Sequence, residues 1–401
     1  MVGAHDLYAL YDTASDQFIF ISRKGLLMEL HQLPSFLMER WFAEFEFVQG
    51  MRNLAASGPF AVKTGELLEL GGAETTARYL DLDLDYIENP GSESLRQAVA
   101  NQYTTLDAGD LRITSGASEA LFLLMWTMAA PGMNIVIEEP CYGSVPGIAQ
   151  SLGIEVRTLS LRQEDGWRPD LEQLDRLIDG KTRLVYLVHP HNPTGSVLSK
   201  EEMQGIAEMT KRAGAVLVND EVFRLIPLEE EPLPSVVDVI KDAVSIGDMT
   251  KPWGLGGLRV GWVASRRHDL LDLISSSRDY STMCSSAPGS FLAELALRHS
   301  AQIIAPRLAA ARANRDQLAE AITNSQGALS WRRPAAGYTA FVQLPAHLSI
   351  TALCRRLARE QRLLLLPGEV YGSVYERFVR IGFGCDPGLF QEGLATLLEA
   401  L

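Results

Sequence analysis

Short apolar runs alternate with segments of helical periodicity through the middle of the chain. The apolar runs predict strands at 111–114, 134–139, 183–189, 215–220, 243–247 and 262–264. Between them, apolar residues recur at helical spacing, and the stretch from Ser92 to Arg96 carries the signature of a capped helix start. Strands that alternate with helices favour an α/β fold with a mostly parallel sheet, whose functional residues gather at the loop ends of the strands.

The N-terminal part follows a different pattern. Residues 1–24 contain aromatic and apolar residues that predict a short hairpin. Further on, Leu37, Trp41 and Phe45 recur at helical spacing and predict a helix that faces the core, and a Gly-Pro turn at 58–59 follows it.

The C-terminal part is rich in long helices. After about residue 281, segments rich in Ala, Arg and Leu precede predicted strands at 337–343 and 378–384. This pattern favours a second, smaller α+β domain. The predicted division is an accessory extension (1–30), a segment that joins the small domain (31–70), a large domain (71–284) and a small C-terminal domain (285–401).

Composition and charge narrow the class of protein. A chain of 401 residues with 47% hydrophobic residues can bury two large cores. A formal net charge of −14, with no basic block to offset it, argues against nucleic acid or an anionic membrane as a partner. No apolar run reaches the length of a membrane span, and the start lacks a basic region followed by an apolar one. The four cysteines lie far apart and in no metal-ligand spacing, so a reduced, cytoplasmic location is expected and no metal site is predicted.

The segment from Gly247 to Trp262 carries the candidate chemistry. Lys251 lies between an apolar strand and a glycine-rich turn, and a lysine in a desolvated turn can act as a nucleophile toward a carbonyl. Arg259 follows among glycines, where a guanidinium can bind a phosphate bidentately. Alone, this lysine could equally be a surface residue beside a turn, so the other motifs decide the interpretation.

This segment resembles the lysine segment of fold-type I pyridoxal-phosphate enzymes, specifically the class I/II aminotransferase family. The resemblance covers roughly residues 35–400, and its strength lies in several motifs that occur in the family's order. It implies an aspartate aminotransferase-like large domain with a seven-stranded, mostly parallel sheet flanked by helices. It also implies that pyridoxal 5′-phosphate is the cofactor, that Lys251 holds it covalently, that Arg259 binds its phosphate and that the substrate is an α-amino acid.

Cofactor-binding residues follow from the same resemblance. A strand, a glycine turn and a helix meet at Gly116, Ala117 and Ser118, and such a helix N-terminus is also an anion site on physical grounds. Tyr142 is expected to stack on the cofactor ring, and Asn192 to donate a hydrogen bond to the ring oxygen. Further expectations are that Asp220 pairs with the ring nitrogen, that Phe223 lies beside it, and that Thr250 contributes to the phosphate site.

Substrate binding and assembly are implied as well. Arg380 is expected to bind the α-carboxylate of the substrate, and Gly58 to line the mouth of the substrate pocket. Tyr86 matches the tyrosine that reaches a neighbouring subunit's phosphate in the family, although Tyr79 competes for this role. A homodimer is therefore predicted. His189 and His191 lack partners at catalytic or metal spacing and are interpreted as supporting loop residues.

Two positions depart from the family pattern. Phe223 stands where a tyrosine usually bonds the cofactor oxygen, and Asp248 stands where a serine commonly helps to bind phosphate. We expect Asp248 to point away from the phosphate, with Thr250 or Ser118 supplying the hydroxyl. Residues 53–60 and 65–68 are closer in form to the group that contains capreomycidine synthase than to ordinary aspartate aminotransferases.

Three functions remain open. The leading one is transamination of an α-amino acid. The second is a specialised cyclase or a β/γ-eliminating lyase of the capreomycidine synthase kind, which uses the same carbanion but expels a leaving group. The third is a binding or regulatory protein that retains the fold without catalysis, against which the presence of Lys251, Asp220 and Asn192 argues.

Overall fold

The computed structural model describes residues 7–12, 17–22, 33–128, 130–229 and 232–401. The chain divides into two compact units, 1–34 and 35–401. In the first unit, β1 (Leu7–Asp12) and β2 (Gln17–Ser22) pair in antiparallel fashion, with Leu7 opposite Ser22. The hairpin predicted for this region is confirmed.

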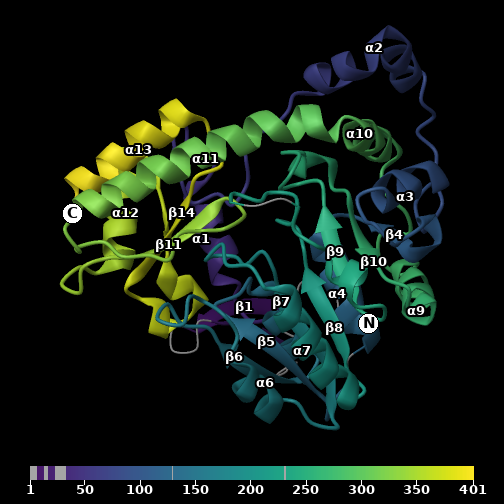
Figure 1. Ribbon diagram of the computed structural model, residues 1–401, viewed down its shortest axis with the longest axis horizontal. Helices are drawn as coiled ribbons and strands as arrows, with labels where there is room; N and C mark the ends of the chain where they lie inside the picture. The colour runs from purple at the N-terminus through teal and green to yellow at the C-terminus, as the bar shows by residue number, and fades with distance from the viewer. Residues whose placement is uncertain (1–6, 13–16, 23–32, 129, 230–231) are drawn as a thin grey trace. The chain divides into compact units, whose positions relative to one another are not determined.

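A seven-stranded sheet is the centre of the second unit. Its order is β4 (Leu111–Thr114), β10 (Gly261–Ala264), β9 (Val244–Asp248), β8 (Val216–Asp220), β7 (Thr182–Val188), β5 (Asn134–Glu139) and β6 (Glu155–Ser160). β10 runs antiparallel to both of its neighbours, and the pairs from β9 to β6 are parallel. The predicted α/β fold with a mostly parallel sheet is therefore confirmed (Figure 1).

Both faces of this sheet are buried. Along β7, Leu184, Tyr186 and Val188 belong to one hydrophobic cluster, while Val185 and Leu187 belong to another. Successive side chains of a strand point to opposite faces, so a strand covered on both sides is apolar throughout. The covering helices are α3 (Glu93–Ala100), α4 (Ala117–Met128), α5 (Ser144–Ser151), α6 (Leu171–Leu177), α7 (Lys200–Arg212), α8 (Val236–Val239), α9 (His268–Arg278) and α10 (Ala287–Arg298).

Helix starts follow the sequence. Ser92 caps α3 as predicted, since its hydroxyl accepts a hydrogen bond from the Leu95 N–H at 3.3 Å. At α7, Ser199 and Glu202 form a capping box, in which each side chain accepts from the other residue's backbone N–H.

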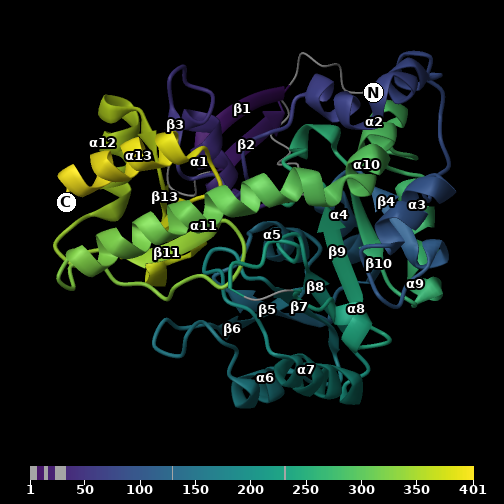
Figure 2. The ribbon, with the colours of Figure 1, turned by 45° about the horizontal axis from the view of Figure 1, so that its top comes forward.

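A second, antiparallel sheet holds β11 (Thr339–Gln343), β14 (Phe378–Gly382) and β13 (Leu366–Pro367). It is accompanied by α11 (Ser300–Asn324), α12 (Ile350–Gln361) and α13 (Pro387–Glu399), and α13 packs along α11 (Figure 2). β3 (Arg52–Asn53) pairs in parallel with β12 (Leu363–Leu364), which ties the segment after α1 (Leu37–Phe45) to the C-terminal part. The remaining helix, α2 (Thr64–Leu80), is interrupted at Gly72.

The prediction for α1 was right in type and wrong at one residue. Trp41 and Phe45 are buried as expected, but Leu37 is 51% exposed and Met38 faces the core instead. Leu37 is the first helical residue, so its side chain remains at the solvent-facing end of the helix. Residues 38, 41 and 45 share the buried face.

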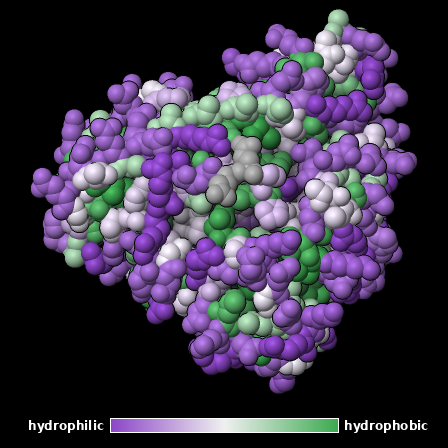
Figure 3. All heavy atoms as spheres, in the orientation of Figure 1, coloured by the Kyte–Doolittle hydropathy of each residue, from purple (hydrophilic) through white to green (hydrophobic). Residues whose placement is uncertain are grey.

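Hydrophilic side chains cover most of the face shown in Figure 3, with separate apolar patches between them. Within the described ranges, no helix combines the length and hydropathy that crossing a membrane requires. The same residues contain no group of three or more His, Cys, Asp or Glu side chains placed to hold a metal ion.

Candidate active site

A cavity of about 390 Å³ opens where the carboxyl ends of β7, β8 and β9 meet the N-terminus of α4 and the buried face of α1. Eleven of the residues predicted for the site line this cavity: Gly58, Ala117, Ser118, Tyr142, Asn192, Asp220, Phe223, Thr250, Lys251, Arg259 and Arg380. Gly116 lies just behind Arg259, and Tyr86 is not among the lining residues. The structure thus brings most of the predicted residues together, and their individual roles remain predictions.

Lys251 lies in the turn that follows β9. Its amine donates a hydrogen bond to the Ser57 hydroxyl at 3.0 Å and lies 5.9 Å from the centre of the Phe223 ring. Burial lowers the pKa of Lys251, and the nearby Arg380 acts in the same direction, while Asp248 and Asp220 oppose them. A lowered pKa leaves more of the amine neutral, which is the form that attacks a carbonyl.

Asp220 ends β8 and is 6% exposed. Burial raises its pKa to about 7, although it accepts hydrogen bonds from the Val222 N–H and the Tyr186 hydroxyl, each at 3.2 Å. A carboxyl group held in this way gains most from a cationic N–H partner, which would favour its ionised form.

The turn before α4 is packed so closely that only glycine fits. Gly116 has a φ of +82°, and a Cβ there would lie 2.4 Å from Nη2 of Arg259. A Cβ on Gly261 would lie 2.5 Å from the carbonyl carbon of Gly116. This packing brings the first turn of α4 next to Arg259, and Ala117, Ser118 and Arg259 all line the cavity, so the donor set suits a phosphate monoester.

Asp248 also lines the cavity, and the expectation that it points away from the phosphate stays a prediction. Its carboxylate lines the cavity and accepts from the Thr250 N–H at 2.9 Å and from the Thr250 hydroxyl at 2.8 Å. These two local hydrogen bonds fix the carboxylate in the turn. The Thr250 hydroxyl is thus engaged by Asp248, and the Ser118 hydroxyl interacts with the side chain of Tyr142.

Arg380 and Asn192, which also line the cavity, form a buried pair. The Arg380 guanidinium, on a side chain only 1% exposed, donates to Oδ1 of Asn192 at 3.0 Å and to the Tyr371 hydroxyl at 2.8 Å. It also donates to the Ala55 carbonyl at 2.6 Å. Since the Asn192 oxygen accepts from Arg380, its amide N–H₂ group is left to donate toward the cavity.

Sequence reasoning missed two acidic residues, one on α1 and one that caps its C-terminus. Glu39 accepts a hydrogen bond from the Tyr142 hydroxyl at 3.1 Å, and Glu46 accepts one from the Asn53 amide at 3.2 Å. Burial and the neighbouring Glu39 raise the pKa of Glu46. Both line the cavity together with Phe42, and the spacing of 39, 42 and 46 indicates a shared helical face but not that this face meets the cavity.

Tyr86 is 79% exposed and takes no part in the cavity of its own chain. Tyr79, the competing candidate, is partly buried and packs against the ring of Phe291 at 5.5 Å. The predicted role at a neighbour's site therefore stays a prediction for Tyr86.

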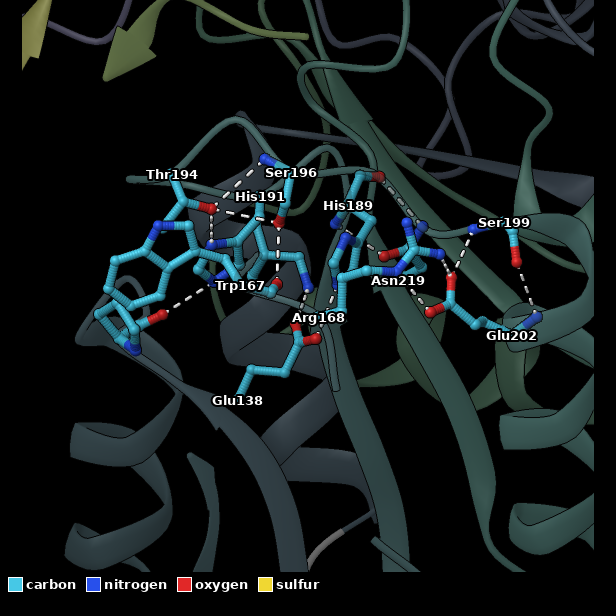
Figure 4. Close-up of polar contacts among 12 residues, drawn as sticks. Glu138, Trp167, Arg168, His189, His191, Thr194, Ser196, Ser199, Glu202 and Asn219 are labelled. Atoms are coloured by element: carbon cyan, nitrogen blue, oxygen red, sulfur yellow. Dashed lines mark hydrogen bonds and ion pairs between the residues drawn. The ribbon is translucent and has the colours of Figure 1, made fainter. Parts of the chain in front are cut away.

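A buried polar network supports the site from below (Figure 4). Nε2 of His189 lies 2.6 Å from Oε1 of Glu138, and the backbone N–H of His189 donates to Oδ1 of Asn219 at 3.0 Å. Burial lowers the pKa of His191 to about 4, so its neutral ring donates from Nε2 to the Pro140 carbonyl at 2.9 Å and accepts from Thr194 at Nδ1. Both histidines thus act as supporting residues, as interpreted from the sequence, for the loop of Asn192 and the strand of Asp220.

The residues present fit pyridoxal 5′-phosphate. The donor set of Ser118 and Arg259 suits its phosphate, Asp220 its ring nitrogen, the Asn192 amide its ring oxygen and Lys251 its aldehyde. The acid at Asp248 also lines the cavity and does not favour an anion.

Comparisons with known proteins agree with this chemistry. Residues 75–397 match the family model for aminotransferase class I and II. Capreomycidine synthase from Streptomyces vinaceus is 34% identical over 371 residues, which cover 92% of this chain and 94% of that protein.

Two solved structures are similar over almost the whole chain. A PLP-dependent aminotransferase from Streptococcus suis 89-1591 superposes with a TM-score of 0.86 and 28% identity, covering 92% of this chain and 98% of the other. The PLP-dependent cyclase OrfR superposes with a TM-score of 0.84 and 27% identity, covering 93% of this chain and 99% of the other. The chain therefore belongs to the class I and II aminotransferases, a family of pyridoxal-phosphate-dependent enzymes.

Proposed function

We propose that this enzyme binds pyridoxal 5′-phosphate, removes the Cα proton of an α-amino acid and transfers its amino group to a keto acid. The observation that carries the proposal is the convergence of Lys251, Asp220 and Arg380 on one cavity of about 390 Å³. When bound, the cofactor supplies an electron sink for the negative charge that develops at Cα.

The side chains of the chain have distinct tasks in this proposal. Lys251 holds the cofactor and, once free, carries the Cα proton. Asp220 keeps the ring nitrogen protonated, because an ionised carboxylate opposite an N–H stabilises that proton. Arg380 provides the positive charge that binds the α-carboxylate of the substrate, although its guanidinium already donates to Asn192 and to the Ala55 carbonyl.

We further propose that the side chain of the substrate is positively charged. Glu39 and Glu46 both line the cavity, and neither forms an ion pair with any residue in the described part of the chain. The Glu39 carboxylate lies near enough to add to the rise in the pKa of Glu46, which burial mainly causes, and to oppose the lowering of the Lys251 pKa. Two carboxylates without a fixed counter-ion favour a guanidinium or ammonium group in the same space.

The test compares charged amino acids with neutral analogues of the same shape. The holoenzyme is incubated with arginine or citrulline, and with lysine or norleucine, each with pyruvate or 2-oxoglutarate. We expect turnover that depends on the keto acid and prefers the charged member of each pair. The variant Glu39→Gln/Glu46→Gln should lose this preference, and equal turnover of both members by the unaltered enzyme would exclude the cationic substrate.

Cyclisation after loss of a leaving group is the second candidate. It is favoured by the similarity to capreomycidine synthase, which extends over 92% of this chain. Release of water or ammonia without a keto acid, measured by mass spectrometry of the products, would support this candidate and contradict transamination. Borohydride reduction of either enzyme should attach the cofactor to the peptide that contains Lys251, and attachment at another lysine would refute the assignment of the site.

A further inference from the structure

Lys251 has an unassigned partner in Ser57. The Ser57 hydroxyl lies 3.0 Å from the Lys251 amine, and this is the hydrogen bond that the described structure gives to that amine. Phe223, whose ring centre lies 5.9 Å from the amine, has no polar side-chain atom to offer. Ser57 is therefore the polar group that determines where a free Lys251 amine lies.

The backbone that carries Ser57 is fixed from several sides. Oδ1 of Asn53 accepts from the N–H groups of Ala55 and Ala56, at 3.0 and 2.9 Å. The Arg380 guanidinium donates to the Ala55 carbonyl. A Cβ on Gly382 would lie only 1.9 Å from the Ala56 carbonyl oxygen, so β14 packs directly against this loop.

The same loop connects Ser57 to the region where substrate is expected. Ala55 contacts Arg380, the group proposed to bind the α-carboxylate, and Gly58 lines the cavity. A substrate whose carboxylate lies at Arg380 has its Cα close to this loop. The hydroxyl of Ser57 thus holds the amine on the side of the cavity from which a Cα proton arrives.

Charged groups compete for the amine. Asp248 and Asp220 both favour its ammonium form, and they lie at the ends of β9 and β8. An amine that is not held by Ser57 is drawn toward these carboxylates, because opposite charges attract strongly in a partly buried site. It would then no longer be fixed to the loop that contacts Arg380.

We propose that Ser57 is a positioning residue for Lys251, which directs the free ε-amine toward the aldehyde of the cofactor and toward Cα of the substrate. Only the direction of the amine toward Cα rests on the proposed function. Its direction toward the cofactor aldehyde does not, because capture of the cofactor requires no substrate. The proposal holds for transamination and for cyclisation, since both begin with removal of the Cα proton.

The first experiment measures capture of pyridoxal 5′-phosphate by the apoenzyme in a stopped-flow spectrophotometer. We expect Ser57→Ala to slow capture about three- to tenfold, because the net free energy of one hydrogen bond corresponds to a rate change of this size. Ser57→Thr, which keeps the hydroxyl, should stay near the rate of the unaltered enzyme. Ser276→Ala, at an exposed serine of α9, is the matched control and should have no effect.

The second experiment follows exchange of the Cα hydrogen of arginine with deuterium in D₂O by NMR, without a keto acid. We expect Ser57→Ala to slow exchange roughly tenfold to a hundredfold at full cofactor loading, as misplacement of a catalytic group does. Ser57→Thr should restore it.

The outcomes separate the proposals. A normal rate of cofactor capture by Ser57→Ala would overturn the positioning role. Equally slow capture by Ser57→Thr and Ser57→Ala would also overturn it, because the effect would then depend on side-chain shape and not on the hydroxyl. Unaltered enzyme that exchanges no basic amino acid contradicts the proposed function, while the capture rates still decide the role of Ser57.

Discussion

At the scale of single residues, Phe223 is the departure with the clearest chemical consequence. Phe223 and Asn192 both line the cavity. In the proposed site, a tyrosine at position 223 would donate to the ring oxygen of the cofactor together with Asn192, whereas Phe223 has no group to donate. Loss of a hydrogen bond to the anionic oxygen disfavours that form. The proton shared between the ring oxygen and the nitrogen of the Lys251 link should therefore persist to higher pH.

The corresponding prediction concerns Phe223→Tyr. A charge-assisted hydrogen bond is worth about 1.5–3 kcal/mol, which corresponds to roughly one to two pKa units. The substitution should lower the pKa of the lysine–cofactor link by this order, as seen in a spectrophotometric pH titration of the resting holoenzyme. An unchanged titration would mean that residue 223 does not face the ring oxygen.

Asp220 leads to a prediction for the apoenzyme. Burial raises the pKa of Asp220 in the folded protein from 3.8 to about 7. Between pH 4 and pH 7, the folded protein therefore keeps a proton on this carboxyl group, whereas the unfolded chain has released it. The contribution of Asp220 to the free energy of unfolding is therefore largest below pH 4, and it falls as the pH rises toward 7. Asp220→Asn removes this dependence.

We expect apo Asp220→Asn to match the unaltered protein near pH 4 and to exceed its unfolding free energy at pH 8, by roughly 2–4 kcal/mol. Urea unfolding at both pH values measures the difference. Asp83→Asn, at an exposed aspartate, serves as the control for the charge change. A difference that does not vary with pH would show that Asp220 is already ionised in the folded apoenzyme.

At the scale of elements, sequence periodicity predicted six of the seven strands of the large sheet and the strand-end residues that meet at the cavity. It missed β6, an edge strand that is only partly buried. These contacts follow from the rule that parallel strands collect their loop ends at one edge. The periodicity of α1 was correctly interpreted as helical, but which face meets the cavity depends on the packing of a helix that is distant in sequence. Glu39 and Glu46 were missed for this reason, and Ser57 because a loop of small residues has no periodicity.

The contact between β10 and the start of α4 supports a further prediction. A Cβ on Gly261 would lie 2.5 Å from the Gly116 carbonyl carbon and 2.7 Å from the Ala117 nitrogen. Gly261→Ala must therefore displace the turn that we propose to bind the phosphate. We expect cofactor affinity to fall about tenfold or more, because 1.4 kcal/mol suffices for that loss and overpacking commonly costs 1–3 kcal/mol.

Gly257→Ala is the matched control, since a Cβ there meets no atom within 4 Å. Titration of each apoenzyme with pyridoxal 5′-phosphate gives the dissociation constants. Equal affinities for the two variants would argue against a phosphate site at this turn.

At the scale of the whole molecule, the second unit exposes apolar side chains that its own fold does not use. Leu84, Tyr86 and Tyr280 are 83%, 79% and 96% exposed. The segments that carry them are adjacent, because the Asn89 amide donates to Asp279 at 2.7 Å. Large exposed apolar side chains on neighbouring segments are compatible with a protein interface, and the homodimer stays a prediction.

Sharing of sites between two chains can be tested by complementation. Lys251→Ala removes the amine from one site, and Tyr86→Ala removes the hydroxyl that we expect to serve the neighbour's phosphate. Each variant should have little activity by itself. In a hybrid dimer, one of the two sites contains Lys251 from one chain and Tyr86 from the other, so it is intact. A mixture refolded at equal amounts should therefore regain about a quarter of normal activity, because half of the dimers are hybrids with one active site each.

Sedimentation measures whether dimers form, and tagged subunits show whether they are hybrids. Hybrid dimers without activity would refute the sharing of sites, and full activity of Tyr86→Ala alone would transfer the expected role to Tyr79.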